Sequence, residues 1–94
     1  MTPRFVLVHG AYHGGWCWDR LTPILQVRGA AVSVPDLPGH GGDRTPSVDL
    51  TLTLYADHIA GAVRQAGGPV TLVGHSMAGA VIAEVAERVP DLLT

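Results

Sequence analysis

The amino-acid sequence predicts an α/β fold in which flanking helices cover a parallel sheet. Three short runs of apolar and β-branched residues, at 4–10, 30–36 and 69–75, are each bounded by Gly or Pro. Such runs are typical of strands that are buried on both faces of a parallel sheet. A helix-compatible segment follows each run, so we expect the order β-α-β-α-β-α with right-handed crossovers.

The first two helices have clear start or stop signals. The segment 18–29 carries its apolar residues on one side and stops at Gly29. Because Pro23 suits the first turn of a helix better than a later one, we expect this helix to begin near Thr22. The second segment, 52–68, ends at a pair of glycines.

The third helix is expected over 77–89, an alanine-rich segment with an apolar and a charged face. Pro90 disfavours helix at the residue before it and is expected to close this helix. The long irregular stretch is 35–49, whose Gly, Pro, Asp and Ser content is typical of a loop.

Composition and charge restrict the class of protein. The 94 residues are 47% hydrophobic and 15% charged, which is the composition of a globular chain with a modest core. The formal net charge is −2 and lysines and arginines do not cluster. A nucleic acid or an anionic membrane is therefore not expected as a partner.

The cellular location is predicted from two further features. Cys17 is the only cysteine, so no disulfide can form within the chain and nothing demands an oxidising compartment. The apolar run before His9 has four residues, whereas a signal-peptide core needs roughly 7–15 and a membrane span roughly 18. We therefore expect a cytoplasmic protein.

The stretch "VTLVGHSMAGAV" places Ser76 at the junction of the third strand and the third helix. A turn this abrupt lifts the hydroxyl clear of the sheet and requires small residues nearby, which Gly74 and Ala78 supply. The helix N-terminus would also direct N–H groups at an anion formed there. The alternative role is that of a helix-capping serine, and the motif alone does not decide between the two.

A glycine-rich loop, "HGAYHGGWCW" at 9–18, follows the first strand. Loops at the carboxyl ends of parallel strands meet in one crevice, so a backbone N–H of this loop can approach the serine. Two N–H donors on one oxygen make an oxyanion hole, worth about 3–4 kcal/mol per donor.

Three stretches together, "FVLVHGAYHGGWCW", "PDLPGHG" and "LVGHSMAGAV", resemble the α/β-hydrolase superfamily. The chain looks most like the esterase branch that includes plant methylesterases and hydroxynitrile lyases. The resemblance covers nearly all of residues 1–94 and implies the N-terminal β-α-β-α-β-α part of one hydrolase domain. It also implies that the first strand lies between the second and the third.

The resemblance implies a set of site residues. Ser76 would be the nucleophile, and the backbone N–H groups of Ala11 and Met77 would form the oxyanion hole. Tyr12 and His13 can line the pocket. Ala78 departs from the Gly-x-Ser-x-Gly pattern, which implies a tighter turn. No cofactor and no metal are expected.

A serine nucleophile needs a base and an acid, which follow it in this fold in the order Ser, acid, His. After Ser76 the sequence offers Glu84, Glu87 and Asp91 but no histidine. The five histidines all precede Ser76: His9, His13, His40, His58 and His75. His9 is expected to be structural, and His13 either bonds within its loop or has a proton-transfer role. We expect the acid and base beyond residue 94, in a chain of roughly 200–250 residues.

Three functions follow as hypotheses. The first is a serine hydrolase that acts on a carboxylic ester through an acyl-enzyme. The second is a hydroxynitrile lyase, disfavoured because Gly10 stands where related lyases carry threonine. The third is a non-catalytic hydrolase-fold binding module. The expected partners are a small-molecule ester and, because the third strand has an open edge, the remaining C-terminal portion or a second copy.

Overall fold

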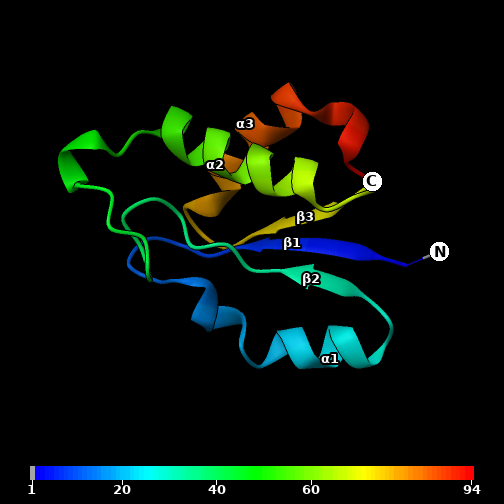
Figure 1. Ribbon diagram of the computed structural model, residues 1–94. Helices are drawn as coiled ribbons and strands as arrows, with labels where there is room; N and C mark the ends of the chain where they lie inside the picture. Colours follow the sequence, from blue (N-terminus) through cyan, green and yellow to red (C-terminus); the bar gives the residue numbers. More distant parts are fainter. Residues whose placement is uncertain (1) are drawn as a thin grey trace.

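In a computed structural model of the chain, residues 2–94 are described and form a three-stranded parallel sheet between helices (Figure 1). The strands are β1 (Arg4–Val8), β2 (Ala31–Ser33) and β3 (Thr71–Gly74), in the spatial order β2-β1-β3. This order and the parallel direction confirm the predicted architecture.

The register of the central strand decides where the loops begin. Val6 of β1 faces Ser33 of β2, and Val8 of β1 faces Gly74 of β3. The ladder extends by one bond beyond β3, because the N–H of His75 donates to the Val8 carbonyl at 3.0 Å. The loops that follow β1 and β3 therefore leave the sheet side by side.

The helices cover the two faces unequally. α2 (Leu52–Gln65) and α3 (Ala78–Arg88) pack on one face, and α1 (Leu21–Val27) lies on the other (Figure 1). Short 3-10 helices cover Gly15–Trp18, Ser47–Asp49 and Pro90–Leu92. Thr51 caps α2, since its hydroxyl accepts the Leu54 N–H at 3.0 Å.

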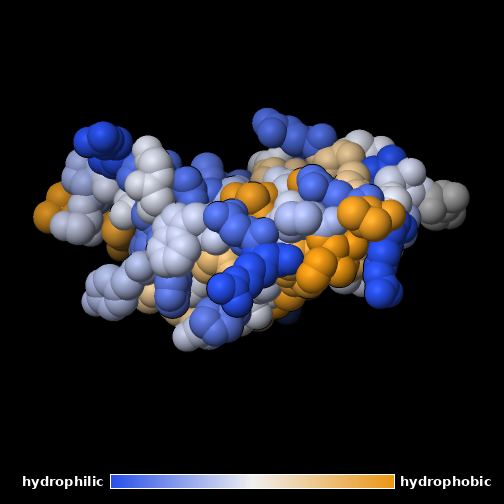
Figure 2. All heavy atoms as spheres, turned by 90° about the horizontal axis from the view of Figure 1, so that it is seen from below, coloured by the Kyte–Doolittle hydropathy of each residue, from blue (hydrophilic) through white to orange (hydrophobic). Residues whose placement is uncertain are grey.

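The hydrophobic core lies between the sheet and the α2–α3 layer. Most of its fully buried side chains come from one face of β1 and from the inner faces of the two helices: Val6, Val8, Ala56, Ile59, Ala60, Val63, Ala78, Val81 and Val85. Leu37 and Val70 are buried with them. In contrast, α1 adds no side chain to this core, because none of its seven residues is buried and Val27 is 88% exposed. Figure 2 shows apolar atoms gathered at the surface on the side that carries α1.

The predicted element ends need small corrections. The predicted start of the first helix is confirmed, because α1 begins at Leu21 and has Pro23 in its first turn. The third helix, α3, is one residue shorter at each end than the predicted 77–89. The strands are shorter than 4–10, 30–36 and 69–75. β1 ends before His9 because the His9 ring forms hydrogen bonds with the loops, to the Gly10 carbonyl and from the Leu37 N–H. β2 ends early because the glycine-rich loop crosses its end at Gly15.

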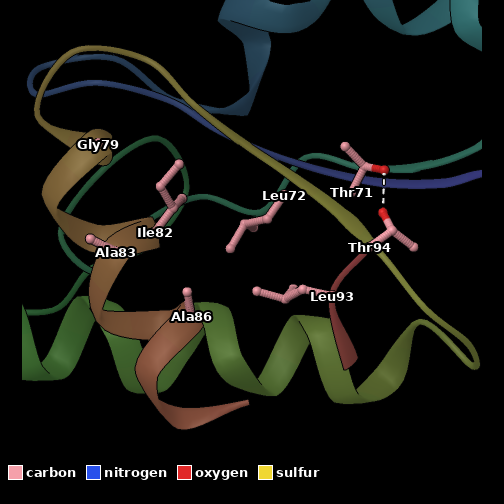
Figure 3. Close-up of a pocket in the computed structure, with 8 residues that line it drawn as sticks. All are labelled: Thr71, Leu72, Gly79, Ile82, Ala83, Ala86, Leu93 and Thr94. Atoms are coloured by element: carbon pink, nitrogen blue, oxygen red, sulfur yellow. Dashed lines mark hydrogen bonds between the residues drawn. The ribbon is translucent and has the colours of Figure 1, made fainter. Parts of the chain in front are cut away.

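A fourth position in the sheet begins beside β3. Val70 and Leu93 form a parallel bridge, in which the Val70 N–H donates to the Leu92 carbonyl and the Thr94 N–H to the Val70 carbonyl, each at 2.9 Å. Beyond it, β3 and α3 enclose an apolar groove of about 400 Å³, into which Leu72, Ile82 and Leu93 project (Figure 3).

Within residues 2–94, no helix has both the length and the apolar character needed to cross a bilayer.

Replacing Ile59 with alanine tests the packing of α2 on the sheet. Ile59 is fully buried, so Ile59→Ala should lower the free energy of unfolding by about 2–5 kcal/mol. Ile24→Ala is the matched control, because Ile24 of α1 is 54% exposed and should cost less than about 1 kcal/mol. Urea unfolding measures both, and equal losses would contradict this assignment of the core.

Candidate functional site

Ser76 occupies a sharp turn between β3 and α3. Its φ of 58° lies in the left-handed region, which for a residue other than glycine costs about 1–3 kcal/mol. Two bonds close the turn, from the Ala78 N–H to the His75 carbonyl at 3.1 Å and from the Gly79 N–H to the Ser76 carbonyl at 2.9 Å. The turn leaves Ser76 exposed at the carboxyl end of β3.

The residues flanking this turn have no room to be larger. A Cβ atom on Gly74 would lie 2.8 Å from the Ala78 carbonyl oxygen, which is too close for any side chain. Ala78 itself is fully buried in the core. The need for a very small residue at 74 is therefore confirmed, and the methyl group of Ala78 is accommodated by packing.

The glycine-rich loop after β1 lies directly against the serine. A Cβ atom on Gly10 would be 3.2 Å from the Ser76 Cβ and 3.1 Å from the His75 carbonyl oxygen. Within residues 2–94, neither the Ala11 N–H nor the Met77 N–H donates to a protein acceptor. Ala11 directly follows Gly10, and Met77 directly follows Ser76, so the two N–H groups belong to the residues next to the Gly10–Ser76 contact.

His9 fixes the start of that loop. Its ring is fully buried, with Nδ1–H donating to the Gly10 carbonyl at 2.7 Å and Nε2 accepting the Leu37 N–H at 2.9 Å. Burial lowers the pKa of His9 below its ordinary 6.5, which favours the neutral ring that both bonds require. The structural role predicted for His9 is confirmed.

Asp36 ties the same loop to the segment after β2. Its carboxylate accepts the Gly15 N–H at 2.6 Å and the Gly42 N–H at 3.0 Å. These two donors hold the pKa of Asp36 below its ordinary 3.8. Asp36 was not predicted as a site residue, although an aspartate at the end of a predicted strand, followed by a glycine-rich loop, is a signal for such a contact.

Asp43 organises the rest of this segment. Its carboxylate accepts the Gly39 N–H at 2.9 Å, the Thr45 N–H at 2.8 Å and the Thr45 hydroxyl at 2.6 Å. The Thr45 hydroxyl makes the largest contribution and, with the two N–H groups, lowers the pKa of Asp43 to about 2. Two carboxylates thus hold the loops that surround the site.

Tyr12 and His13 take different positions. Tyr12 has a φ of 63° and its side chain is 97% exposed. The His13 ring lies 5.4 Å from the Trp16 ring and 6.1 Å from the His75 ring, and its Nδ1 is a buried atom without a partner in residues 2–94. His13 is therefore next to the residue that precedes Ser76.

The other histidines do not complete a triad. No histidine among residues 2–94 hydrogen-bonds the Ser76 hydroxyl, and His40 bonds through Nδ1 to the Pro38 carbonyl at 3.0 Å. In the same residues no three His, Cys, Asp or Glu side chains are grouped for a metal ion. The Ser76 turn, with the neighbouring Ala11 and Met77 N–H groups, can hold an anionic oxygen. None of these histidines supplies the base that a serine nucleophile needs.

Comparison with known proteins gives a consistent result. Residues 5–93 match the alpha/beta hydrolase family. The chain is 38% identical over 87 residues to the pyrethroid hydrolase of Sphingobium wenxiniae, covering 92% of this chain and 31% of that protein. It is 37% identical over 95 residues to methylesterase 2 of Arabidopsis thaliana, covering 97% and 36% respectively.

A similar fold is found among solved structures. A variant of polyneuridine aldehyde esterase superposes with a TM-score of 0.91 at 28% identity, covering 99% of this chain and 38% of that one. The chain therefore spans about one third of the length of the relatives it matches.

Alanine substitutions at two glycines test the turn. Gly74→Ala forces a Cβ onto the Ala78 backbone and should lower the free energy of unfolding by about 1–3 kcal/mol. Gly61→Ala, in the middle of α2 with open space around its Cβ, should raise it by up to about 1 kcal/mol. Thermal or urea unfolding measures both, and a stable Gly74→Ala variant would rule out the close contact.

The lowered pKa of His9 predicts how stability depends on pH. Below pH 6.5, the ordinary value, the unfolded chain takes up a proton that the folded chain resists. The free energy of unfolding should therefore fall as the pH is lowered from about 7 to about 5, and the contribution of His9 to this fall should be absent above that range.

His9→Gln removes the titrating ring and should show a smaller loss of stability between these two pH values, measured by urea unfolding. Gln65→Ala, at an exposed position of α2, is the control and should keep the pH dependence of the unmodified protein. An equal loss in the unmodified protein and in His9→Gln would contradict the role assigned to this ring.

Proposed function

Because the chain belongs to the alpha/beta hydrolase family, we propose that Ser76 is the nucleophile of a hydrolase that acts on carboxylic esters. The observation that carries the proposal is the backbone of Ser76, left-handed and exposed at the end of β3, with Gly10 packed against it. Relatives that are a pyrethroid hydrolase and a methylesterase support esters as the substrate class.

The proposed reaction begins with attack of the Ser76 Oγ on the ester carbonyl carbon. The carbonyl oxygen becomes negatively charged and accepts the Ala11 and Met77 N–H groups, each worth about 3–4 kcal/mol in the transition state. Met77 precedes α3, so the positive end of the helix dipole adds to this stabilisation. The serine proton passes through a base to the leaving alcohol, and water then releases the acid from the acyl-serine. No step requires a cofactor.

We propose that the base and the acid that orients it belong to polypeptide outside residues 1–94, as in a protein of the length of the relatives. The docking site for that polypeptide is the open edge of β3 together with the apolar groove beside α3. Leu93 and Thr94 already pair with Val70, and the Thr94 and Thr71 hydroxyls are 2.8 Å apart (Figure 3). A strand that continues from Thr94 would pair with Leu72 and Gly74 and direct apolar side chains into the groove.

Two features bear on the remaining expectations. Gly10 has no hydroxyl to offer a cyanohydrin, which supports ester hydrolysis over the lyase alternative. The lone Cys17 supports a cytoplasmic location, where thiols stay reduced.

A chimera tests the function. Residues 1–94 replace the matched segment of the Sphingobium pyrethroid hydrolase, which supplies the rest of the domain. A fluorophosphonate should label Ser76, as located by peptide mass mapping, and the chimera should hydrolyse an ester. Ser76→Ala should abolish both, whereas Ser33→Ala, at an exposed position of β2, should change neither.

Gly10→Ala and Gly61→Ala separate the effect of the loop that contacts Ser76 from general effects of a glycine-to-alanine change. The first places a Cβ 3.2 Å from the Ser76 Cβ and should lower the rate of hydrolysis by at least about tenfold. The second has open space and should keep the rate. A folded chimera that is not labelled at Ser76 would support a binding module, and cleavage of a cyanohydrin without ester hydrolysis would support the lyase.

A further inference from the structure

A second cavity, of about 310 Å³, lies between the loops that follow β1 and β2. Its lining comes from the glycine-rich loop and from the segment after β2: Tyr12, His13, His40, Ser47 and Leu50, with two glycines. Since β1, β2 and β3 are parallel, these loops lie at the same edge of the sheet as Ser76. The cavity and the nucleophile turn are therefore neighbours.

His13 connects the two places. Its ring lines the cavity and lies 6.1 Å from the ring of His75, the residue before Ser76. The His13 ring therefore lies between the cavity that it lines and the ring of His75. A molecule that reacts at Ser76 and is longer than the ester group itself can reach the cavity past this ring.

Tyr12, at the rim of the cavity, has a strained backbone conformation that its residue type does not favour. It and Ser76 are the two residues other than glycine that have a positive φ within residues 2–94. Strained backbone of this kind is found at functional sites, and it persists where neighbouring contacts fix it. The ring is 97% exposed, so a large aromatic surface is left for a ligand to cover.

The walls of the cavity are preformed. Asp43 fixes Gly39, at which a Cβ would come within 2.8 Å of Leu50. His40 is fixed by its Nδ1–H bond to the Pro38 carbonyl and by contact with the Tyr55 ring, 5.9 Å away. Rigid walls lower the entropy lost on binding.

The chemistry of the lining indicates the ligand. None of the described lining residues is Lys, Arg, Asp or Glu. Aromatic and aliphatic surfaces alternate with a hydroxyl and two imidazoles, and the buried Nδ1 of His13 lacks a partner. The volume is at the lower end for small-molecule sites, which suits one ring system.

We propose that this cavity is a subsite for a flat, neutral, aromatic group of the ester substrate, with Tyr12 and Leu50 as specificity-determining residues. The proposal rests on the proposed function for its meaning as a substrate subsite. Binding of the aromatic group itself requires neither Ser76 nor a catalytic base, so the subsite can be tested on the 94-residue chain.

The test is a titration of the chain with 2-naphthol, followed by the amide shifts of its ¹⁵N-labelled backbone. We expect shifts at Tyr12, His13, His40 and Leu50, with a Kd of about 1 mM or tighter, as suits a fragment of this size. Tyr12→Asn removes the ring but keeps a residue that tolerates positive φ. This variant and Leu50→Ala should each weaken binding by at least about fivefold.

Two controls give the result its meaning. Val48→Ala changes an 88% exposed side chain that lies next to the lining residue Ser47, and its Kd should stay within about twofold. Ser76→Ala should also bind as the unmodified chain does. The absence of shifts, shifts confined to the groove at Leu72, Ile82 and Ala86, or unchanged binding by Tyr12→Asn and Leu50→Ala would each overturn the subsite. Failure of fluorophosphonate labelling would overturn the nucleophile and leave this result intact.

Discussion

The parallel pairing of β1 with β3 is the constraint on which the site depends. It places Val8 opposite Gly74, so that the next residues of both strands turn away from the sheet together. A Cβ at residue 10 would then lie in tight contact with the turn, 3.1 Å from the His75 carbonyl oxygen and 3.2 Å from the Ser76 Cβ. Shifting this register by one residue would reverse the faces of β3 and move the serine away from the loop. Core packing of Val6 and Val8 under α2 and α3 holds the register, so the chemistry rests on the hydrophobic core.

Polar groups then hold the loops where the core cannot reach. His9 joins Gly10 to Leu37, and Asp36 joins Gly15 to Gly42, so two side chains fasten the loop after β1 to the segment after β2. Charge-assisted and buried bonds of this kind are stronger than ordinary surface contacts. They hold the loop that contacts Ser76 in one position, which the proposed oxyanion hole requires.

The sequence predicts the features that local pattern decides. Apolar runs give the strands, Pro23 gives the start of α1, and the small residues beside Ser76 give the turn. Contacts between distant residues could not be predicted in the same way. Asp36 meets Gly15 across 21 residues and His9 meets Leu37 across 28, and no periodicity records such pairings. Tyr12 gives no signal either, because its left-handed backbone is imposed by the loop and is not favoured by the residue type.

The unequal covering of the sheet separates the molecule into parts of different local stability. α1 leaves all seven of its described residues out of the core, so little apolar contact is lost when it unwinds. β1, β3, α2 and α3 share one continuous core and open together. Amide hydrogens of α1 therefore exchange with solvent through local fluctuations, at a small fraction of the global unfolding free energy. The bond from the His75 N–H to the Val8 carbonyl, which supports the turn, stays closed during these events because β1 and β3 belong to the continuous core.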